Sequence, residues 1–259
     1  MKKIYIKKIP GLTKIYFLFK YINNYFFYIL AFFKFKSLSR DLRFKILWRD
    51  RRPCLKDNTK FTDFDRHYIY HPAWAARILA KINPKEHVDI SSTLHFCSLI
   101  SAFIPTKFYD FRPAELKLNN LEISKADLTA LPFENDSIIS LSCMHTIEHI
   151  GLGRYGDPIN PEADLKAFSE LERVLANNGN LLLVIPIGIP KICFNAYRVY
   201  SYQQIIDNLP SLTLVEFSLI PDKKEDGDIL SPATKEMANK QNYGCGCFWF
   251  TKKLSNLER

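Results

Sequence analysis

The chain has 259 residues, which is enough for one large domain with a full core or for two small domains. Its hydrophobic share of 47% and its charged share of 24% are ordinary for a globular protein and exclude an intrinsically disordered chain. The formal net charge of +9 is unevenly distributed, because residues 1–60 hold 16 Lys and Arg against three acids. That segment carries a net +13, which leaves −4 for the remaining residues.

The N-terminal arm, residues 1–60, combines lysines with clusters of aromatic residues. Its uncharged stretch, residues 21–33, contains Asn23 and Asn24 and is shorter than the about 20 apolar residues of a membrane span. No small-residue cleavage site follows, so we predict no cleaved signal peptide. Lysines beside aromatic clusters are typical of an element that lies on an anionic membrane surface. We therefore predict such a contact through residues 1–36; packing on the domain or a partner chain, and a true span, are the alternatives.

Two further features bear on partners and location. No nucleic-acid recognition module accompanies the basic arm, so nucleic acid is not a predicted partner. The six cysteines form no C-x-x-C pair, which argues against a disulfide framework and for a reducing compartment. We predict a cytoplasmic protein that is peripheral at the inner face of the cell membrane.

From residue 61 onward, short apolar runs alternate with helical patterns. Pro72 is expected in the first turn of a helix that continues to Ile82. A second well-delimited helix is expected to begin at Asn160 and Pro161 and to stop at Gly179. The predicted strands are 87–91, 107–111, 121–127, 137–143, 180–188, 212–220 and 243–252. This order predicts an α/β fold, a doubly wound and mostly parallel seven-stranded sheet in residues 61–259, preceded by a helical arm.

The segment from His145 to His149 spells H-x-x-E-H, a zinc-peptidase signature. A strand precedes it, and Gly151 and Gly153 interrupt any helix within two turns, so the helical context of that signature is missing. The position just after a strand's carboxyl end is where open α/β sheets bind ligands. We therefore interpret the segment as a site loop and predict no metal ligands, including at His67 and His71, since Pro72 follows them.

Residues 85–200 resemble the class I S-adenosylmethionine-dependent methyltransferases. The matching blocks are "HVDIS", "FYDFRP", "KADLTALPFENDSIISLSCMHTIEHI" and "DLKAFSELERVLANNGNLLLVIPIG". The resemblance implies a Rossmann-like fold and S-adenosyl-L-methionine as cofactor. It implies that Asp110 binds the ribose hydroxyls and that Asp127 and Leu128 flank the adenine, while Asp89 ends the first strand.

One departure concerns the turn after the first strand, where the family has G-x-G-x-G and this chain has Ser91, Ser92 and Thr93. The glycines allow positive φ and a close approach of the backbone to the cofactor. Hydroxyl groups can donate hydrogen bonds to the cofactor's carboxylate, but a β-branched Thr93 crowds the turn. Either the cofactor is retained in a somewhat different position, or it does not bind.

Methyl transfer to a sugar hydroxyl requires a base, and histidine is the usual one because its pKa lies near neutrality. The predicted catalytic residues are therefore His145, Glu148 and His149; the alternative is a structural or substrate-orienting role. The predicted substrate-binding residues lie on loops rich in polar groups: Arg154, Tyr155, Asp157, Asn195, Arg198 and His67.

A narrower resemblance links residues after 60 to a little-characterised methyltransferase-like family that is often associated with bacterial surface-polysaccharide gene clusters. It is carried by "FDRHYIYHPAWAA", "HVDISS", "MHTIEHIGLGRYGDP" and "YGCGCFWF". It implies an acceptor in a surface glycan or its lipid-linked precursor. We expect a sugar O-methyltransferase, or alternatively a non-catalytic scaffold of the same fold in glycan assembly, or a catalytic site with different chemistry on a polysaccharide precursor.

Overall fold

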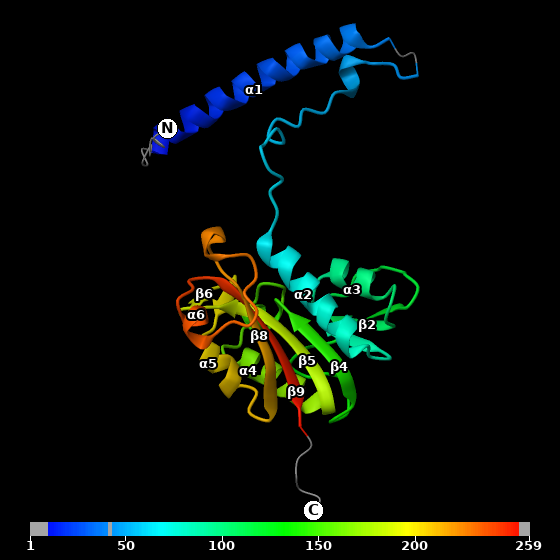
Figure 1. Ribbon diagram of the computed structural model, residues 1–259, viewed down its shortest axis with the longest axis vertical. Coiled ribbons are helices and arrows are strands. Elements are labelled where there is room, and N and C mark those ends of the chain that lie inside the picture. Colours follow the sequence, from blue (N-terminus) through cyan, green and yellow to red (C-terminus); the bar gives the residue numbers. More distant parts are fainter. Residues whose placement is uncertain (1–9, 41–42, 254–259) are drawn as a thin grey trace, which may run out of the picture. The chain divides into compact units, whose positions relative to one another are not determined.

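A computed structural model describes residues 10–40 and 43–253. The chain divides into two compact units, residues 1–63 and residues 64–259 (Figure 1).

The first unit is dominated by one long helix, α1 (Pro10–Leu38). One face of α1 is covered by the segment that follows, where Trp48 of the short helix η1 (Trp48–Asp50) contacts the rings of Phe32 and Phe33 at centroid distances of 4.9 and 5.9 Å. Asn24 donates a hydrogen bond to the Leu55 carbonyl at 3.1 Å. The other faces of α1 expose many aromatic and aliphatic side chains. In the described part of the chain, no helix combines the length and the apolar character needed to cross a membrane.

The second unit is built on one seven-stranded sheet, which confirms the predicted fold (Figure 1). Its strand order is β3-β2-β1-β4-β5-β9-β8, in which the first five strands are parallel and β9 runs antiparallel to both neighbours. The strands are β1 (His87–Ile90), β2 (Thr106–Asp110), β3 (Leu121–Lys125), β4 (Ile138–Met144), β5 (Leu175–Ile187), β8 (Leu212–Ile220) and β9 (Gly244–Lys252).

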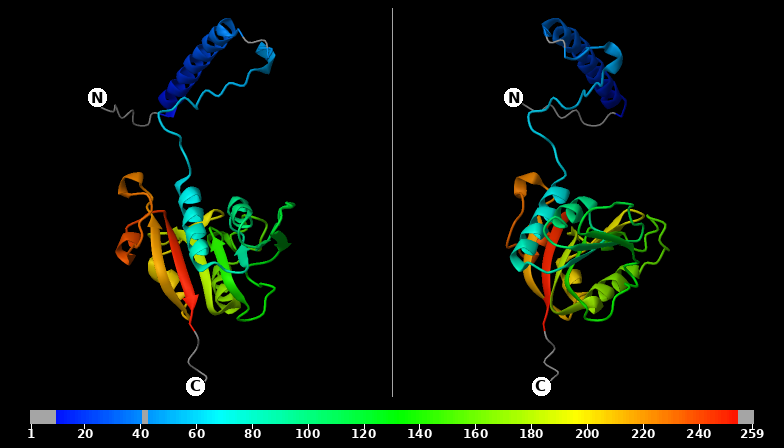
Figure 2. Two further views of the ribbon diagram at one scale, coloured as in Figure 1. Left: turned by 45° about the vertical axis from the view of Figure 1, so that its right-hand side comes forward. Right: turned by 90° about the vertical axis from the view of Figure 1, so that its right-hand side faces the viewer.

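Helices cover both faces of the sheet, as the two views of Figure 2 also show. Along β5, Leu181 and Leu183 face a core shared with α4, whereas Leu182 and Val184 face a second core shared with α2 and α3. Burial on both faces explains why this strand is apolar throughout rather than alternating. The helices are α2 (Arg66–Ile82), α3 (Leu94–Ile100), α4 (Ala163–Val174), α5 (Tyr202–Asp207) and α6 (Lys235–Asn239). Short 3-10 turns, η2 (Ile147–His149) and η3 (Lys224–Asp226), and a hairpin of β6 (Lys191–Cys193) and β7 (Tyr197–Val199) complete the unit.

Three helix boundaries differ from the prediction. Helix α4 begins at Ala163, with Glu162 at the N-cap position, and not at Asn160 and Pro161, because the Asn160 side chain accepts a hydrogen bond from Glu162 N at 3.0 Å in a turn that precedes the helix. Helix α2 does not start near Pro72 but at Arg66, because Asp65 caps it by accepting a hydrogen bond from Tyr68 N at 3.2 Å, and Pro72 lies inside the helix. Helix α4 ends at Val174 rather than at Gly179, because Leu175 already pairs with Ile138 of β4. Sheet pairing therefore ends α4 before the glycine.

Candidate functional site

A buried carboxylate stabilises the turn that follows β1. Asp89 is fully buried, and its side chain accepts hydrogen bonds from Ser92 N at 3.0 Å and from the Ser142 hydroxyl. Ser92 Oγ in turn accepts a hydrogen bond from Met144 N at 3.0 Å, which ties the turn to the end of β4. Burial raises the pKa of Asp89 to about 6, against the opposing effect of these hydrogen bonds. Asp89 and Ser92 therefore shape the turn rather than line a cavity.

The hydrogen bonds continue from Ser142 to a buried histidine. His87 Nε2 lies 2.8 Å from Ser142 Oγ, and His87 Nδ1 lies 2.8 Å from Ser140 Oγ. Because the Ser142 hydroxyl donates to Asp89, it accepts from His87, so Nε2 carries the proton and Nδ1 accepts from Ser140. Burial lowers the pKa of His87 to about 3, so this imidazole is neutral.

The turn after β1 contains a left-handed residue although it has no glycine. Ser91 has a φ of +56°, in the left-handed region, and its amide donates to the Tyr109 carbonyl at 2.8 Å. Thr93 has an ordinary φ of −86° and caps α3, since its hydroxyl oxygen accepts from Phe96 N at 3.2 Å. The expected crowding by Thr93 therefore does not occur, because its side chain is engaged by the helix that follows.

A cavity of about 160 Å³ lies beside this turn, at the carboxyl edge of the parallel strands. Ser91, Phe111, Asp127 and Leu128 form part of its wall. Phe111 directly follows Asp110, the last residue of β2, whose Oδ1 accepts from Arg112 N at 2.6 Å. Asp127 Oδ1 accepts from both the amide and the hydroxyl of Thr129 at 2.8 Å. The cavity thus gathers three of the predicted cofactor residues, with Asp110 adjacent to its wall.

The loop after β4 also lines this cavity, and Tyr155 is one of its lining residues. The guanidinium of Arg112 lies 4.5 Å from the centroid of the Tyr155 ring, and that of Arg154 lies 5.0 Å away on the same loop. Asp157 also lines the cavity, but its carboxylate accepts hydrogen bonds from Gly151 N at 2.7 Å and Tyr155 N at 3.2 Å. Asp157 therefore organises the loop.

The three predicted catalytic residues lie together where β4 ends. Glu148 is buried, and its Oε1 lies 2.8 Å from His145 Nδ1 and 3.8 Å from His149 Nε2. His149 lines the cavity, and its Nδ1 donates to the Ala196 carbonyl at 2.6 Å, which leaves Nε2 on the side of Glu148. An Arg154 nitrogen also lies 3.3 Å from Nδ1, but a nitrogen that donates its proton cannot accept one, so the shorter contact defines the tautomer.

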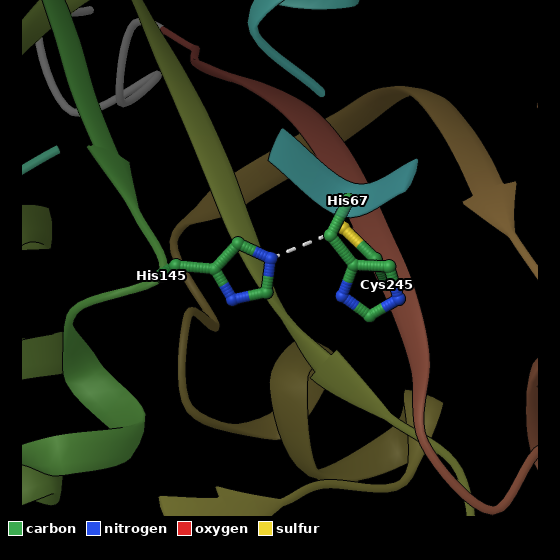
Figure 3. Close-up of side chains that lie close together, drawn as sticks. All are labelled: His67, His145 and Cys245. Carbon is green, nitrogen blue, oxygen red and sulfur yellow. Dashed lines mark hydrogen bonds between the residues drawn. The ribbon is translucent and has the colours of Figure 1, made fainter. Parts of the chain in front are cut away.

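A second group of side chains surrounds His145 on the other side (Figure 3). His145 Nε2 lies 3.4 Å from Cys245 Sγ, at the start of β9. The His67 ring, from the first turn of α2, stacks on the rings of both His145 and Tyr243. The ring centroids are 5.5 Å apart for His145 and 5.4 Å apart for Tyr243. Burial, together with His145, lowers the pKa of His67 to about 4, and burial raises the pKa of the Cys245 thiol. His67 is thus brought to the predicted catalytic residues rather than to the cavity wall.

The remaining predicted substrate residues have other positions. Arg198 is only 4% exposed; its guanidinium donates to the Ile150 carbonyl at 2.6 Å and pairs with Asp164 at 3.5 Å. It supports the site loop from inside, which corrects its prediction as a substrate contact. Asn195 Nδ2 donates to the Leu152 carbonyl at 3.4 Å, also on that loop.

Sequence reasoning did not single out Phe111, Cys245 or Tyr243 as site residues. The only available signal for Phe111 was its position directly after the acid that ends β2. Cys245 and Tyr243 had no signal in the sequence, because they reach the site through the pairing of β9 with β5, in which Cys245 lies opposite Pro186.

Comparison with known proteins supports the fold. A sequence profile described as "Caenorhabditis protein of unknown function, DUF268" matches residues 128–217. No curated protein matches the chain in sequence. The chain is similar to the N-methyltransferase NodS of Bradyrhizobium japonicum WM9, solved in complex with S-adenosyl-L-homocysteine, with a TM-score of 0.52 and 14% identity over 84% of this chain and 97% of that one.

It is also similar to the 1,6-didemethyltoxoflavin-N1-methyltransferase of Burkholderia thailandensis, solved with S-adenosylhomocysteine, with a TM-score of 0.52 and 10% identity over 71% of this chain and 79% of that one. At such identities the likeness establishes the architecture. The second unit therefore has the Rossmann-like fold of the S-adenosylmethionine-dependent methyltransferases.

Proposed function

We propose that the protein is an S-adenosylmethionine-dependent methyltransferase that acts on a sugar hydroxyl. The observation that carries this proposal is the cavity at the carboxyl edge of the sheet, which joins the turn after β1, the residues after β2 and β3, and His149 of the loop after β4. Ligands of open α/β sheets bind at this edge. The neighbouring Asp110 and Phe111 offer a carboxylate for ribose hydroxyls and a ring for the adenine.

The residues present fit the adenosyl group. The left-handed Ser91 reproduces the turn that glycine usually makes, and the Ser91 hydroxyl donates to the Tyr109 carbonyl at 3.2 Å rather than into the cavity. At about 160 Å³ the cavity is smaller than the roughly 300 to 1,000 Å³ of typical ligand sites. We infer that the loop carrying Tyr155 moves outward when the cofactor binds, with Gly151 and Gly156 as the pivots, since both already have positive φ.

When bound, the cofactor supplies an electrophilic methyl group on a sulfonium. The protein's task is then to remove a proton from the acceptor hydroxyl as its oxygen bonds to the methyl carbon, while the electron pair of the broken C–S bond stays on sulfur. We assign this proton to His149 Nε2, because His149 lines the cavity and its Nδ1 proton is held by the Ala196 carbonyl. Glu148, 3.8 Å from Nε2, stabilises the resulting imidazolium.

Binding of S-adenosylhomocysteine to the full chain tests the cofactor site by calorimetry, with equilibrium dialysis as a second readout. We expect a single site per chain, which Phe111→Ala weakens about 10- to 100-fold, as expected for the loss of one ring stacked on a base. Asp207→Asn, an exposed acid on α5, serves as a control and leaves binding unchanged. If neither readout detects binding to the folded wild-type protein, the methyltransferase proposal is refuted, and the scaffold and a catalytic site with different chemistry remain as the alternatives.

We further propose that the arm holds the protein on an anionic leaflet where lipid-linked glycans are assembled. Support comes from α1, which exposes Lys14, Lys20 and Lys34 beside exposed aromatic residues such as Phe17 and Phe26. At about 1 kcal/mol for each basic residue near an anionic surface, replacing the three lysines by glutamine lowers vesicle partitioning about 100-fold. A variant in which three basic residues of the second unit are replaced instead serves as the control, and we expect its vesicle partitioning to be unchanged.

Co-sedimentation with phosphatidylglycerol vesicles measures this effect, and phosphatidylcholine vesicles serve as the neutral reference. Equal partitioning to both vesicle types contradicts a role for the lysines. The acceptor is tested separately by mass spectrometry of the surface glycan in cells with and without the gene. Loss of a methyl group from each repeat supports sugar methylation, and an unchanged glycan refutes it.

A further inference from the structure

We propose that His67, His145 and Cys245 bind a zinc ion, and that Glu148 is the outer residue that orients His145 toward the metal. The proposal concerns the group of side chains on the far side of His145 from the cavity, next to the loop after β4.

The three side chains converge from three separate elements (Figure 3). His67 comes from the first turn of α2, His145 from the exit of β4 and Cys245 from the start of β9, and one ligand atom from each lies within 4.8 Å of the other two. Zn–N bonds of about 2.0 Å and Zn–S bonds of about 2.3 Å separate the ligand atoms of a tetrahedral site by roughly 3.5 Å. The distance of 3.4 Å between Cys245 Sγ and His145 Nε2 already fits that geometry. The His67 ligand atom lies within 4.8 Å of the other two, so it must come closer to complete the set.

The environment of His145 is that of a metal ligand. Its Nδ1 lies 2.8 Å from Glu148 Oε1, so Nδ1 carries the proton and the lone pair of Nε2 points toward Cys245. Histidines that bind metals usually donate their other nitrogen to a carboxylate in this way. His145 is also held at a φ of +56°, a backbone conformation that is uncommon for a residue with a side chain and that concentrates at functional sites.

Charge provides an independent argument. Glu148 is 1% exposed, and within 4.0 Å of its carboxylate the described residues supply only the imidazoles of His145 and His149 as basic groups. Glu148 Oε2 has no hydrogen-bond partner among the described residues, and neither has His71 Nε2, on the next turn of α2. Burying a carboxylate without a cation is costly. A divalent ion beside His145 supplies the missing positive charge.

The ligand set selects the kind of metal. Two neutral imidazoles and one thiolate are borderline to soft donors, which favour zinc over magnesium or calcium. Three protein ligands leave the fourth tetrahedral position for water or a substrate oxygen, as in catalytic zinc sites. The proton transfer proposed above stays with His149, which lines the cavity on the other side of His145.

Metal binding to the full chain tests the proposal directly. We expect purified protein to contain about one zinc per chain, measured by inductively coupled plasma mass spectrometry. After removal by a chelator, Co²⁺ should restore a site with the visible absorption of tetrahedral cobalt and a thiolate-to-cobalt charge-transfer band. Cys245→Ser should abolish the charge-transfer band, and His67→Gln should weaken zinc binding at least about 100-fold. Glu148→Gln should weaken it about 10- to 100-fold, as for other outer residues.

Matched controls separate this site from adventitious binding. Cys247, two residues further along β9, is an equally buried thiol, and Cys247→Ser should leave the charge-transfer band intact. His95→Gln removes an exposed histidine and should leave zinc affinity unchanged. Wild-type protein that takes up no more zinc or cobalt than folded Cys245→Ser overturns the proposal, with circular dichroism confirming that both are folded. The metal titrations use no cofactor, so their failure is distinct from a failure to bind S-adenosylhomocysteine.

Discussion

Replacing Asp89 by asparagine should change how the stability of the second unit depends on pH. In the folded protein, burial raises the pKa of Asp89 from its ordinary 3.8 to about 6. A raised pKa means that the folded state prefers the protonated carboxyl, so this contribution to stability is complete below pH 3.8 and is lost as the pH rises through about 6. A shift of about two pH units at 1.36 kcal/mol each makes the loss about 3 kcal/mol.

Asparagine has the same shape and no charge, so Asp89→Asn should not show this loss. Its amide changes the direction of one hydrogen bond, because Ser142 must then accept rather than donate. The Ser142 hydroxyl can turn toward His87 Nε2, and His87 can move its proton to Nδ1, facing Ser140. The buried chain of hydrogen bonds therefore survives the substitution with its direction reversed.

Urea unfolding of the wild type and of Asp89→Asn, at steps between about pH 4 and pH 8, measures the difference in free energy of unfolding. We expect the wild type to lose about 3 kcal/mol relative to the variant across this range. Ser142→Ala is a second probe: it removes a hydrogen bond that lowers the pKa of Asp89, so its transition should move to higher pH. Parallel pH profiles for the wild type and Asp89→Asn would refute the reasoning.

Three smaller perturbations test the local structure by thermal unfolding. Gly151→Ala should destabilise far more than Gly156→Ala: both have positive φ, but a Cβ at Gly151 meets a backbone oxygen at 2.1 Å, whereas none lies within 4 Å at Gly156. Equal effects would contradict the tight contact. Thr93→Ala should cost about 1 kcal/mol because Phe96 N loses its cap, and Thr93→Ser should restore most of it. Phe168→Ala should cost about 3–5 kcal/mol, since its ring is fully buried under the sheet, and a cost below 1 kcal/mol would show that the site repacks.

The sheet could be predicted from the sequence because its strands carry strong local signals. The apolar run that ends at Ile187 is buried on both faces, so its composition alone identifies a central strand. The predicted start of α2 was wrong because a proline is a local signal for a first helical turn. The Asp65 cap and packing against the sheet instead start the helix earlier, so that Pro72 lies inside it. The end of α4 was wrong for a similar reason, since pairing of Leu175 with β4 takes precedence over the later glycine.

The site could be predicted only in part. Asp127, Leu128 and His149 lie on the cavity wall because each follows a strand that ends at the same edge, a relation visible in the sequence. Arg198 resembled a substrate contact because arginine on a loop is usually exposed, and its ion pair with Asp164 was not visible. The dihedral angle of Ser91 could not be predicted either, because serine rarely adopts it.

The reversed direction of β9 has a consequence for how this scaffold diversifies. An antiparallel strand begins where its parallel neighbours finish, so the first residues of β9 join a rim otherwise built by loops that leave the other strands. Substitutions at the start of this one strand can change the side chains at its end of the rim while the half over β1 to β3, where we propose that the adenosyl group binds, stays unchanged. Selection can therefore tune the two halves of the rim independently.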